Sequence, residues 1–183
     1  MTGSLISCPN APEMNKCFID INVVLDTILP GRPLSNASET VLKMGSEECR
    51  LYLSSMSVAT LYYVVRKSVG REEARTIVSE WFKKNYVLPV SDICVYDALR
   101  SDCPDFEDAM QIACADYGDC DCIVTNNVKD FRGYAPLPVF SPEEFIAGCH
   151  EAVVRRHEYY EYLESLPDAR FIDEGPGEKN LGN

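Results

Sequence analysis

The sequence predicts an α/β fold, a three-layer α/β/α sandwich around a mainly parallel sheet of about five strands. Two observations support this prediction. Short apolar runs rich in Val, Ile and Tyr alternate with longer segments whose apolar residues recur at helical spacing. Each short run is bounded by polar or Pro-containing turns, as is typical of buried strands. The five runs are 16–21, 50–56, 86–90, 121–126 and 136–140.

The segments between these runs carry the signals of helices. Leu61 and Val65 in the segment 57–67 recur at helical spacing. Basic residues and then Gly70 follow, as helix C-termini prefer. Val23, Val24 and Leu25 are expected to begin the packing face of a first helix, directly after the first strand. Further helices are expected at about 35–45, 71–84, 91–100 and 105–118.

The pattern changes along the 183 residues in a way that predicts one domain with flanking segments. Residues 1–15 are expected to be an irregular leader, 16–149 the domain, 150–166 a helical extension and 167–183 a disordered tail. No apolar run approaches the roughly 20 residues of a membrane span, and the start lacks the pattern of a signal peptide. A cytoplasmic protein is therefore expected.

Charge and cysteine usage exclude some classes of function. The net charge of −12 argues against sequence-blind affinity for nucleic acid, which depends on Lys and Arg. The negative charge is compatible with an enzyme that binds phosphates through metal ions. The nine cysteines form no CxxC pair, and both histidines lie near the C-terminal end, so a zinc site is not expected. Small buried cysteines in a reducing compartment fit this usage better.

Acidic and amide side chains lie at the ends of predicted strands. Asp20 closes the first run, Asn127 and Asp130 follow the fourth, and Asp105 and Asp108 open the helix before it. Sites in parallel sheets form beyond the carboxyl ends of the strands, so the fold can bring these residues together. A cluster of carboxylates without basic partners needs divalent cations, and hard oxygen ligands favour Mg²⁺ or Mn²⁺.

Each acid also has a purely structural interpretation. Asp105 fits an N-cap, Glu107 or Asp108 complements a helix dipole, Asp20 fits a strand-end cap, and Asp130 fits a turn. Asp26 is interpreted as a packing or surface residue, because a helix that begins after Asp20 points it away from that side chain.

The order of these pieces resembles PIN-domain proteins of the VapC toxin type. The resemblance runs from about residue 16 to 147 and is most specific in "DFEDAMQ", followed by "IVTNNVKDF". It implies an α/β/α sandwich and a metal-dependent endoribonuclease that hydrolyses RNA phosphodiester bonds. It also implies an antitoxin protein that blocks the active site, and a homodimer. An Mg²⁺ or Mn²⁺ cofactor and an RNA substrate follow from the same resemblance.

Ten residues receive expected roles, seven of them by comparison with the family and three because they are the basic residues nearest in sequence to the site. Asp20 matches the acid of the first strand, Asp108 matches the acid that opens the helix, and Asn127 or Asp130 matches the last acidic position. The expected catalytic and metal-binding residues are Asp20, Asp105, Asp108 and Asp130. Asn22, Thr60 and Asn127 are expected to orient ligands or water, and Arg32, Lys129 and Arg132 to contact the RNA backbone.

The main departure from the family pattern is at Thr60, because this residue (or Ala59) stands where a second carboxylate is usual. A hydroxyl can hold a water molecule but adds no charge. One alternative is therefore a catalytically weakened PIN fold that binds RNA or a protein. A third interpretation is a phosphatase of the haloacid dehalogenase type, whose first strand ends in Asp-x-Asp. Here Asn22 replaces the second acid of that motif, which argues against it.

Overall fold

The computed structural model describes residues 15–29, 31–32, 35–45, 49–150 and 161. In this part of the chain, five strands form one sheet in the order β3-β2-β1-β4-β5, and every neighbouring pair is parallel. The strands are β1 (Lys16–Ile19), β2 (Arg50–Ser54), β3 (Tyr86–Leu88), β4 (Cys122–Val124) and β5 (Val139–Phe140).

Helices fill the connections, as expected for a parallel sheet. They are α1 (Ile21–Ile28), α2 (Ser35–Met44), α3 (Ser55–Val69), α4 (Arg71–Phe82), α5 (Asp92–Arg100), α6 (Phe106–Tyr117) and α7 (Val128–Arg132). Residues 142–150 are also helical. Each strand and helix predicted within 16–149 has a counterpart, and the α/β sandwich is confirmed. The short helix α7 was not predicted, because five residues carry too little periodicity to indicate a helix.

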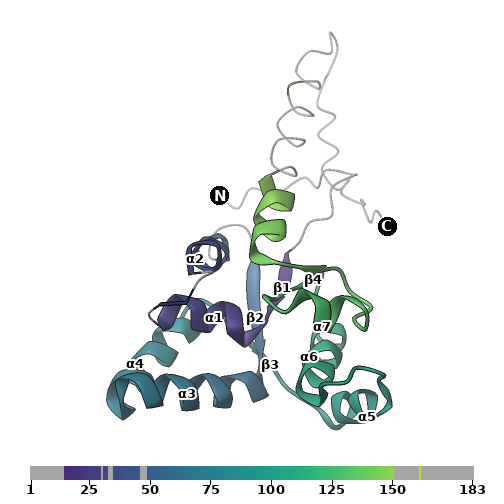
Figure 1. Ribbon diagram of the computed structural model, residues 1–183, viewed down its shortest axis with the longest axis horizontal. Helices are drawn as coiled ribbons and strands as arrows, with labels where there is room; N and C mark the ends of the chain where they lie inside the picture. The colour runs from purple at the N-terminus through teal and green to yellow at the C-terminus, as the bar shows by residue number, and fades with distance from the viewer. Residues whose placement is uncertain (1–14, 30, 33–34, 46–48, 151–160, 162–183) are drawn as a thin grey trace, which may run out of the picture.

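Alternating side chains give the sheet two buried faces. Cys17 and Ile19 of β1 belong to a core that also contains buried residues of α1, α2, α3 and α4. Phe18, between them, belongs to a second core with α5, α6 and α7. Figure 1 shows these two groups of helices on opposite sides of the sheet. The result is the three-layer arrangement that the sequence predicts.

Local capping sets the boundary between strand and helix at two neighbouring strands. Asp20 has an extended backbone and its carboxylate accepts a hydrogen bond from the Asn22 N–H, so α1 begins directly after β1. Ser54 does the same after β2, where its Oγ accepts from the Ser57 N–H at 3.0 Å. Between α3 and α4, Gly70 has a φ of +86°, a conformation that glycine adopts without strain.

The strand order places a crevice beside β1. From β1 the chain moves outward through β2 to β3, and it then returns on the other side of β1 as β4. The segments that follow β1 and β4 therefore turn to opposite faces of the sheet. At such a switch point the carboxyl ends of the strands leave space for a ligand. Asp20 follows β1 and Asn127 follows β4, so both lie at this point.

The flanking segments predicted from the sequence fall almost wholly outside the described residues. This holds for the leader at 1–15, the extension at 150–166 and the tail at 167–183, of which the structure describes Asn15, His150 and Glu161. Within the described residues, no helix combines the length and the apolar character needed to cross a membrane.

Candidate active site

A cavity of about 620 Å³ lies at the switch point between β1 and β4. Four separate segments of the chain line it: the start of α1, the middle of α3, the loop and first turns of α6, and the start of α7. All seven residues that the sequence assigns to ligand or orienting roles belong to this lining, namely Asp20, Asn22, Thr60, Asp105, Asp108, Asn127 and Asp130. The fold therefore brings these residues together, while their roles remain a proposal.

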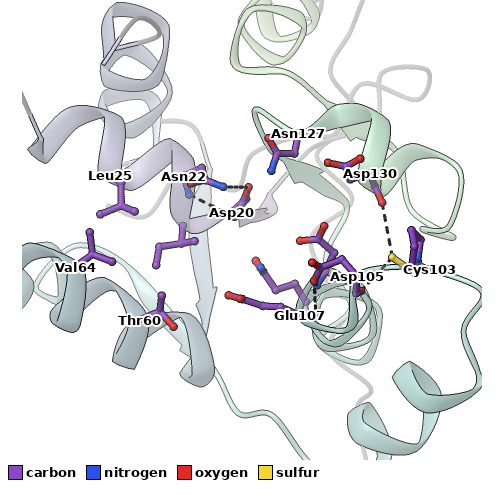
Figure 2. A pocket seen from close by; sticks show the side chains of 14 residues that line it. Asp20, Asn22, Leu25, Thr60, Val64, Cys103, Asp105, Glu107, Asn127 and Asp130 are labelled. Atoms are coloured by element: carbon purple, nitrogen blue, oxygen red, sulfur yellow. Dashed lines mark hydrogen bonds between the residues drawn. The ribbon is translucent and has the colours of Figure 1, made fainter. Parts of the chain in front are cut away.

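Asp20 is the most deeply placed of these acids, with 1% of its surface exposed. Its Oδ2 accepts a hydrogen bond from Thr125 Oγ1 at 2.7 Å and a longer one from Asn22 Nδ2 at 3.3 Å. Figure 2 shows the Asn22 side chain reaching the Asp20 carboxylate. Among the described residues, no basic side chain forms an ion pair with Asp20. Burial raises the pKa of this carboxyl, and the hydrogen bonds from Thr125 and Asn22 oppose that rise.

The N-terminus of α6 brings three further acids to the cavity. Asp105 caps the helix, since its Oδ1 accepts from the backbone N–H groups of Glu107 at 2.8 Å and Asp108 at 3.1 Å. The structural interpretation of Asp105 as an N-cap is thus confirmed, and the residue lines the cavity as well. Asp108 is half-buried. Burial, together with the charges of Asp105, Asp20, Asp130 and Glu107, raises its pKa to about 7.

Asp130 and Asn127 come from the segment after β4. Asn127 precedes α7, and its N–H donates to Thr125 Oγ1 at 3.0 Å. Asp130 lies one turn further on, in the first turn of α7. Cys103 Sγ lies 3.4 Å from the carbonyl oxygen of Asp105 and 3.9 Å from that of Asp130, so it bridges the two acidic segments.

The donor set suits a divalent cation. The groups offered are carboxylate, amide and hydroxyl oxygens, which are the ligands of Mg²⁺ and Mn²⁺. Burial and, after it, the charges of the neighbouring acids raise the pKa of Asp108, and a cation would relieve the repulsion between these acids. Among the described residues, no group of three or more Asp, Glu, His or Cys side chains has the arrangement needed to hold a metal ion. The fit therefore rests on donor chemistry and charge.

The two arginines expected at the rim have other partners. Arg32 Nε pairs with the carboxylate of Asp26, which is 3% exposed and also accepts from Ser38 Oγ at 3.3 Å and Asn126 Nδ2 at 2.6 Å. Asp26 is thus a buried link between α1, α2 and the segment after β4. The alternative that placed it at the surface is wrong, because Arg32 neutralises it in the interior.

The other two residues predicted to contact the RNA backbone, Arg132 and Lys129, also lie outside the cavity lining. Arg132 binds the carbonyl oxygen of Val139 at 2.8 Å and the Glu144 carboxylate at 2.6 Å. Lys129 is exposed on α7 and is not part of the cavity wall. Because Arg32 and Arg132 are paired with the carboxylates of Asp26 and Glu144, their predicted contact with RNA gains no support from this geometry.

Several cavity residues were missed by the sequence analysis. Cys103 and Gln111 line the cavity, and Thr125 donates a hydrogen bond to Asp20. Glu107 also lines it, although its position had suggested only a helix-dipole complement. The helical spacing could have indicated Gln111, which lies three residues after Asp108 and so on the same flank of α6. No local signal marks Thr125, whose partner lies 105 residues away.

The comparisons with solved structures identify similar folds. VapBC2 from Rickettsia felis, bound to a promoter DNA fragment, matches with a TM-score of 0.57 and 18% identity, covering 68% of this chain and 97% of that one. DNA-bound VapBC from Salmonella typhimurium matches with a TM-score of 0.56 and 18% identity, covering 70% and 99%. VapC20 of Mycobacterium tuberculosis, a sarcin–ricin loop cleaving toxin, gives 0.53 and 13%, covering 67% and 98%. At these identities the likeness concerns the fold.

The family comparison is more direct. The sequence profile of the PIN domain matches residues 16–129, which contain four of the five predicted acid and amide positions; the fifth, Asp130, lies one residue beyond the match. A search of curated proteins gave no match. The phosphatase interpretation is set aside by the family match. The chain belongs to the PIN domain family and shares its fold with the VapC toxins.

Proposed function

We propose that this protein is a metal-dependent endoribonuclease, the toxin of a toxin–antitoxin pair, that hydrolyses RNA phosphodiester bonds in the cytoplasm. One observation carries the proposal. Asp20 is buried at the carboxyl end of the central strand, with carboxylates facing the same cavity and, among the described residues, no paired cation. Such an arrangement is costly unless a cation enters it.

Each polar residue of the cavity has a proposed role. Asp20 and Asp108 would hold Mg²⁺ or Mn²⁺, with Asp105 and Asp130 completing the ligands. The bound cation supplies an activated water and stabilises charge on the attacked phosphate. Thr125 and Asn22 fix the orientation of the Asp20 carboxylate through their hydrogen bonds. Thr60 and Asn127 offer polar groups at the wall that can orient water or substrate.

The proposal includes protein partners. Two of the similar structures are VapBC assemblies, and another is described as a toxin–antitoxin complex from Klebsiella pneumoniae, matched with a TM-score of 0.53. An antitoxin segment with basic side chains would suit an acidic cavity in a chain of net charge −12. We also propose that the toxin forms a homodimer.

A second candidate function is a binding module with weak or no catalysis. Thr60 favours it, because this residue contributes a hydroxyl to the cavity wall where the family pattern has a carboxylate. Such a protein would bind RNA or a protein partner through the same cavity without cleaving it.

Cleavage mapping separates the two candidates. A broad pool of single-stranded RNA is incubated with protein and increasing Mn²⁺, and new 5′ ends are mapped by sequencing. The ribonuclease predicts ends that require Mn²⁺ and disappear with Asp20→Asn. Asp26→Asn is the matched control, because it also neutralises a buried α1 carboxylate but lies outside the cavity lining. An intact pool with metal-loaded protein would favour the binding module.

A further inference from the structure

The cavity has two chemically different sides. Asp105, Glu107, Asp108 and Asp130 make one side acidic. The opposite side is neutral and comes from α1 and α3, with the apolar side chains of Ile21, Leu25 and Val64 and the hydroxyl of Thr60. Figure 2 shows Leu25, Val64 and Thr60 facing the acids across the cavity, with Asp20 between them. The acids account for a cation and a phosphate, and they leave the neutral side without a role.

Gln111, on α6, is the residue that points to a further ligand in this cavity. Its side chain lines the cavity and is 2% exposed, one helical turn beyond Asp108 on α6. No group among the described residues donates a hydrogen bond to its Oε1. A buried amide oxygen without a donor is unfavourable, so its presence in a cavity wall indicates a ligand that donates to it. Trp81 Nε1 and Asn126 Oδ1 also lack partners there, but neither residue lines this cavity.

We propose that the neutral side is a nucleobase subsite, which holds the base next to the scissile phosphate. This inference rests on the proposed ribonuclease function and names the part of the substrate that the site selects. The faces of a base are flat and apolar and would contact Ile21, Leu25 and Val64. Its edge carries donors and acceptors, which the Gln111 amide and the Thr60 hydroxyl complement.

The size and position of the subsite agree with this ligand. A cavity of about 620 Å³ is in the range of small-molecule sites and holds a base together with its sugar and phosphate. A base can enter it only when it is unstacked, which selects single-stranded RNA or loops. The Gln111 amide lies one turn from Asp108, so one helix, α6, would contact both the base and the metal ion. Base identity at the cleaved position is then set by Gln111 and Thr60.

Gln111 is the single glutamine of the chain, which allows a direct test. Protein labelled with ¹⁵N-glutamine gives one side-chain amide signal, and it is titrated in Mg²⁺ with AMP, GMP, CMP, UMP and ribose 5-phosphate. The subsite predicts that at least one nucleotide shifts this signal and saturates at a concentration about tenfold lower than ribose 5-phosphate. If every nucleotide behaves like ribose 5-phosphate, or none shifts the signal, the subsite is refuted.

A variant adds an independent readout. Calorimetry should show that Gln111→Met loses about tenfold in affinity for the preferred nucleotide while its affinity for ribose 5-phosphate stays unchanged. Met110→Leu is the matched control, since Met110 is buried on the same helix but does not line the cavity. Equal nucleotide affinity in wild type and Gln111→Met overturns the inference. Failure here is distinguishable from failure of the proposed function, because Mn²⁺-dependent cleavage that is lost with Asp20→Asn is measured separately.

Discussion

Two carboxylates at the two ends of one short helix, Asp20 and Asp26, have opposite surroundings. Both are almost fully buried, at 1% and 3% exposure, so both give up solvation of their charge. For Asp26, an ion pair with Arg32 and hydrogen bonds from two neutral donors, Ser38 and Asn126, compensate for the lost solvation. Among the described residues, the donors to Asp20 are all neutral, with Thr125 and Asn22 as the side-chain donors, and the acids of α6 and α7 share its cavity.

The contrast separates a structural charge from a functional one. A buried carboxylate with its own cation ties elements of the fold together. A buried carboxylate among like charges destabilises the fold until a cation from solution arrives. Burial alone does not distinguish the two cases. The partners of each charge do, and they assign Asp26 to the architecture and Asp20 to the chemistry.

The largest predicted effect is on catalysis at Asp20. Loss of an outer partner of a metal ligand typically costs about 10–100-fold, so Asp20→Asn should lower Mn²⁺-dependent RNA cleavage by at least about 100-fold. Asn keeps the size and can still accept from Thr125, so the fold should persist, which circular dichroism can check. Cleavage at the wild-type rate would contradict the assignment of Asp20.

A smaller effect is expected when Asp20 keeps its charge but loses its support. Thr125→Val removes the 2.7 Å hydrogen bond to Asp20 with little change of volume. Mn²⁺ affinity and cleavage should each fall by about 10–100-fold, as for other partners of ligands. Titration of Mn²⁺ by paramagnetic resonance measures the first, and unchanged affinity would mean that Thr125 does not position the carboxylate.

Asp26→Asn should act on stability and leave catalysis within about threefold of wild type. It removes the charge that Arg32 pairs with, and a hydrogen bond to a charged group contributes about 1.5–3 kcal/mol. For a chain of this length each kcal/mol lowers Tm by about 2–4 °C. Calorimetric melting gives the shift. A variant with normal Tm and lost cleavage would reverse the roles of the two acids.

The smallest effect, with the opposite sign, is expected at Asp108. Because its folded pKa is raised to about 7 from 3.8, the wild-type fold loses stability as pH rises from 3.8 to 7. Asp108→Asn removes that loss. In metal-free buffer at pH 8 it should raise stability by about 1 kcal/mol, a value reduced for solvent screening at this half-buried site. The gain should shrink toward pH 4 and with added Mn²⁺, and a variant less stable than wild type at pH 8 would contradict it.

The sequence predicted the elements that depend on local pattern. The five apolar runs became the five strands, and the two runs that contain Pro, 86–90 and 136–140, form the edge strands β3 and β5. It also predicted which acids follow strand ends, because that needs only the order of elements. For the same reason, the sequence could predict that Asp20 and Asp108 line one cavity.

What the sequence could not give was the partner of each charge. Asp26 receives Asn126 from 100 residues away, and Asp20 receives Thr125 from 105 residues away. Such contacts follow from the pairing of β1 with β4, which periodicity does not encode. Arg32 was therefore expected to contact RNA, although it neutralises Asp26 instead. In the sequence, nothing distinguishes Gln111 from the other residues of its helix. Its burial and its unpartnered oxygen are visible only in the structure.

The most direct test of the central claim is anomalous diffraction from crystals soaked in Mn²⁺. The contrast between the two buried acids predicts a manganese peak between Asp20 and Asp108, at ligand distances of about 2.0–2.6 Å, and none at Asp26. Absence of a peak at saturating Mn²⁺, with Asp20 and Asp108 more than about 8 Å apart and thus unable to share an ion, would contradict the account.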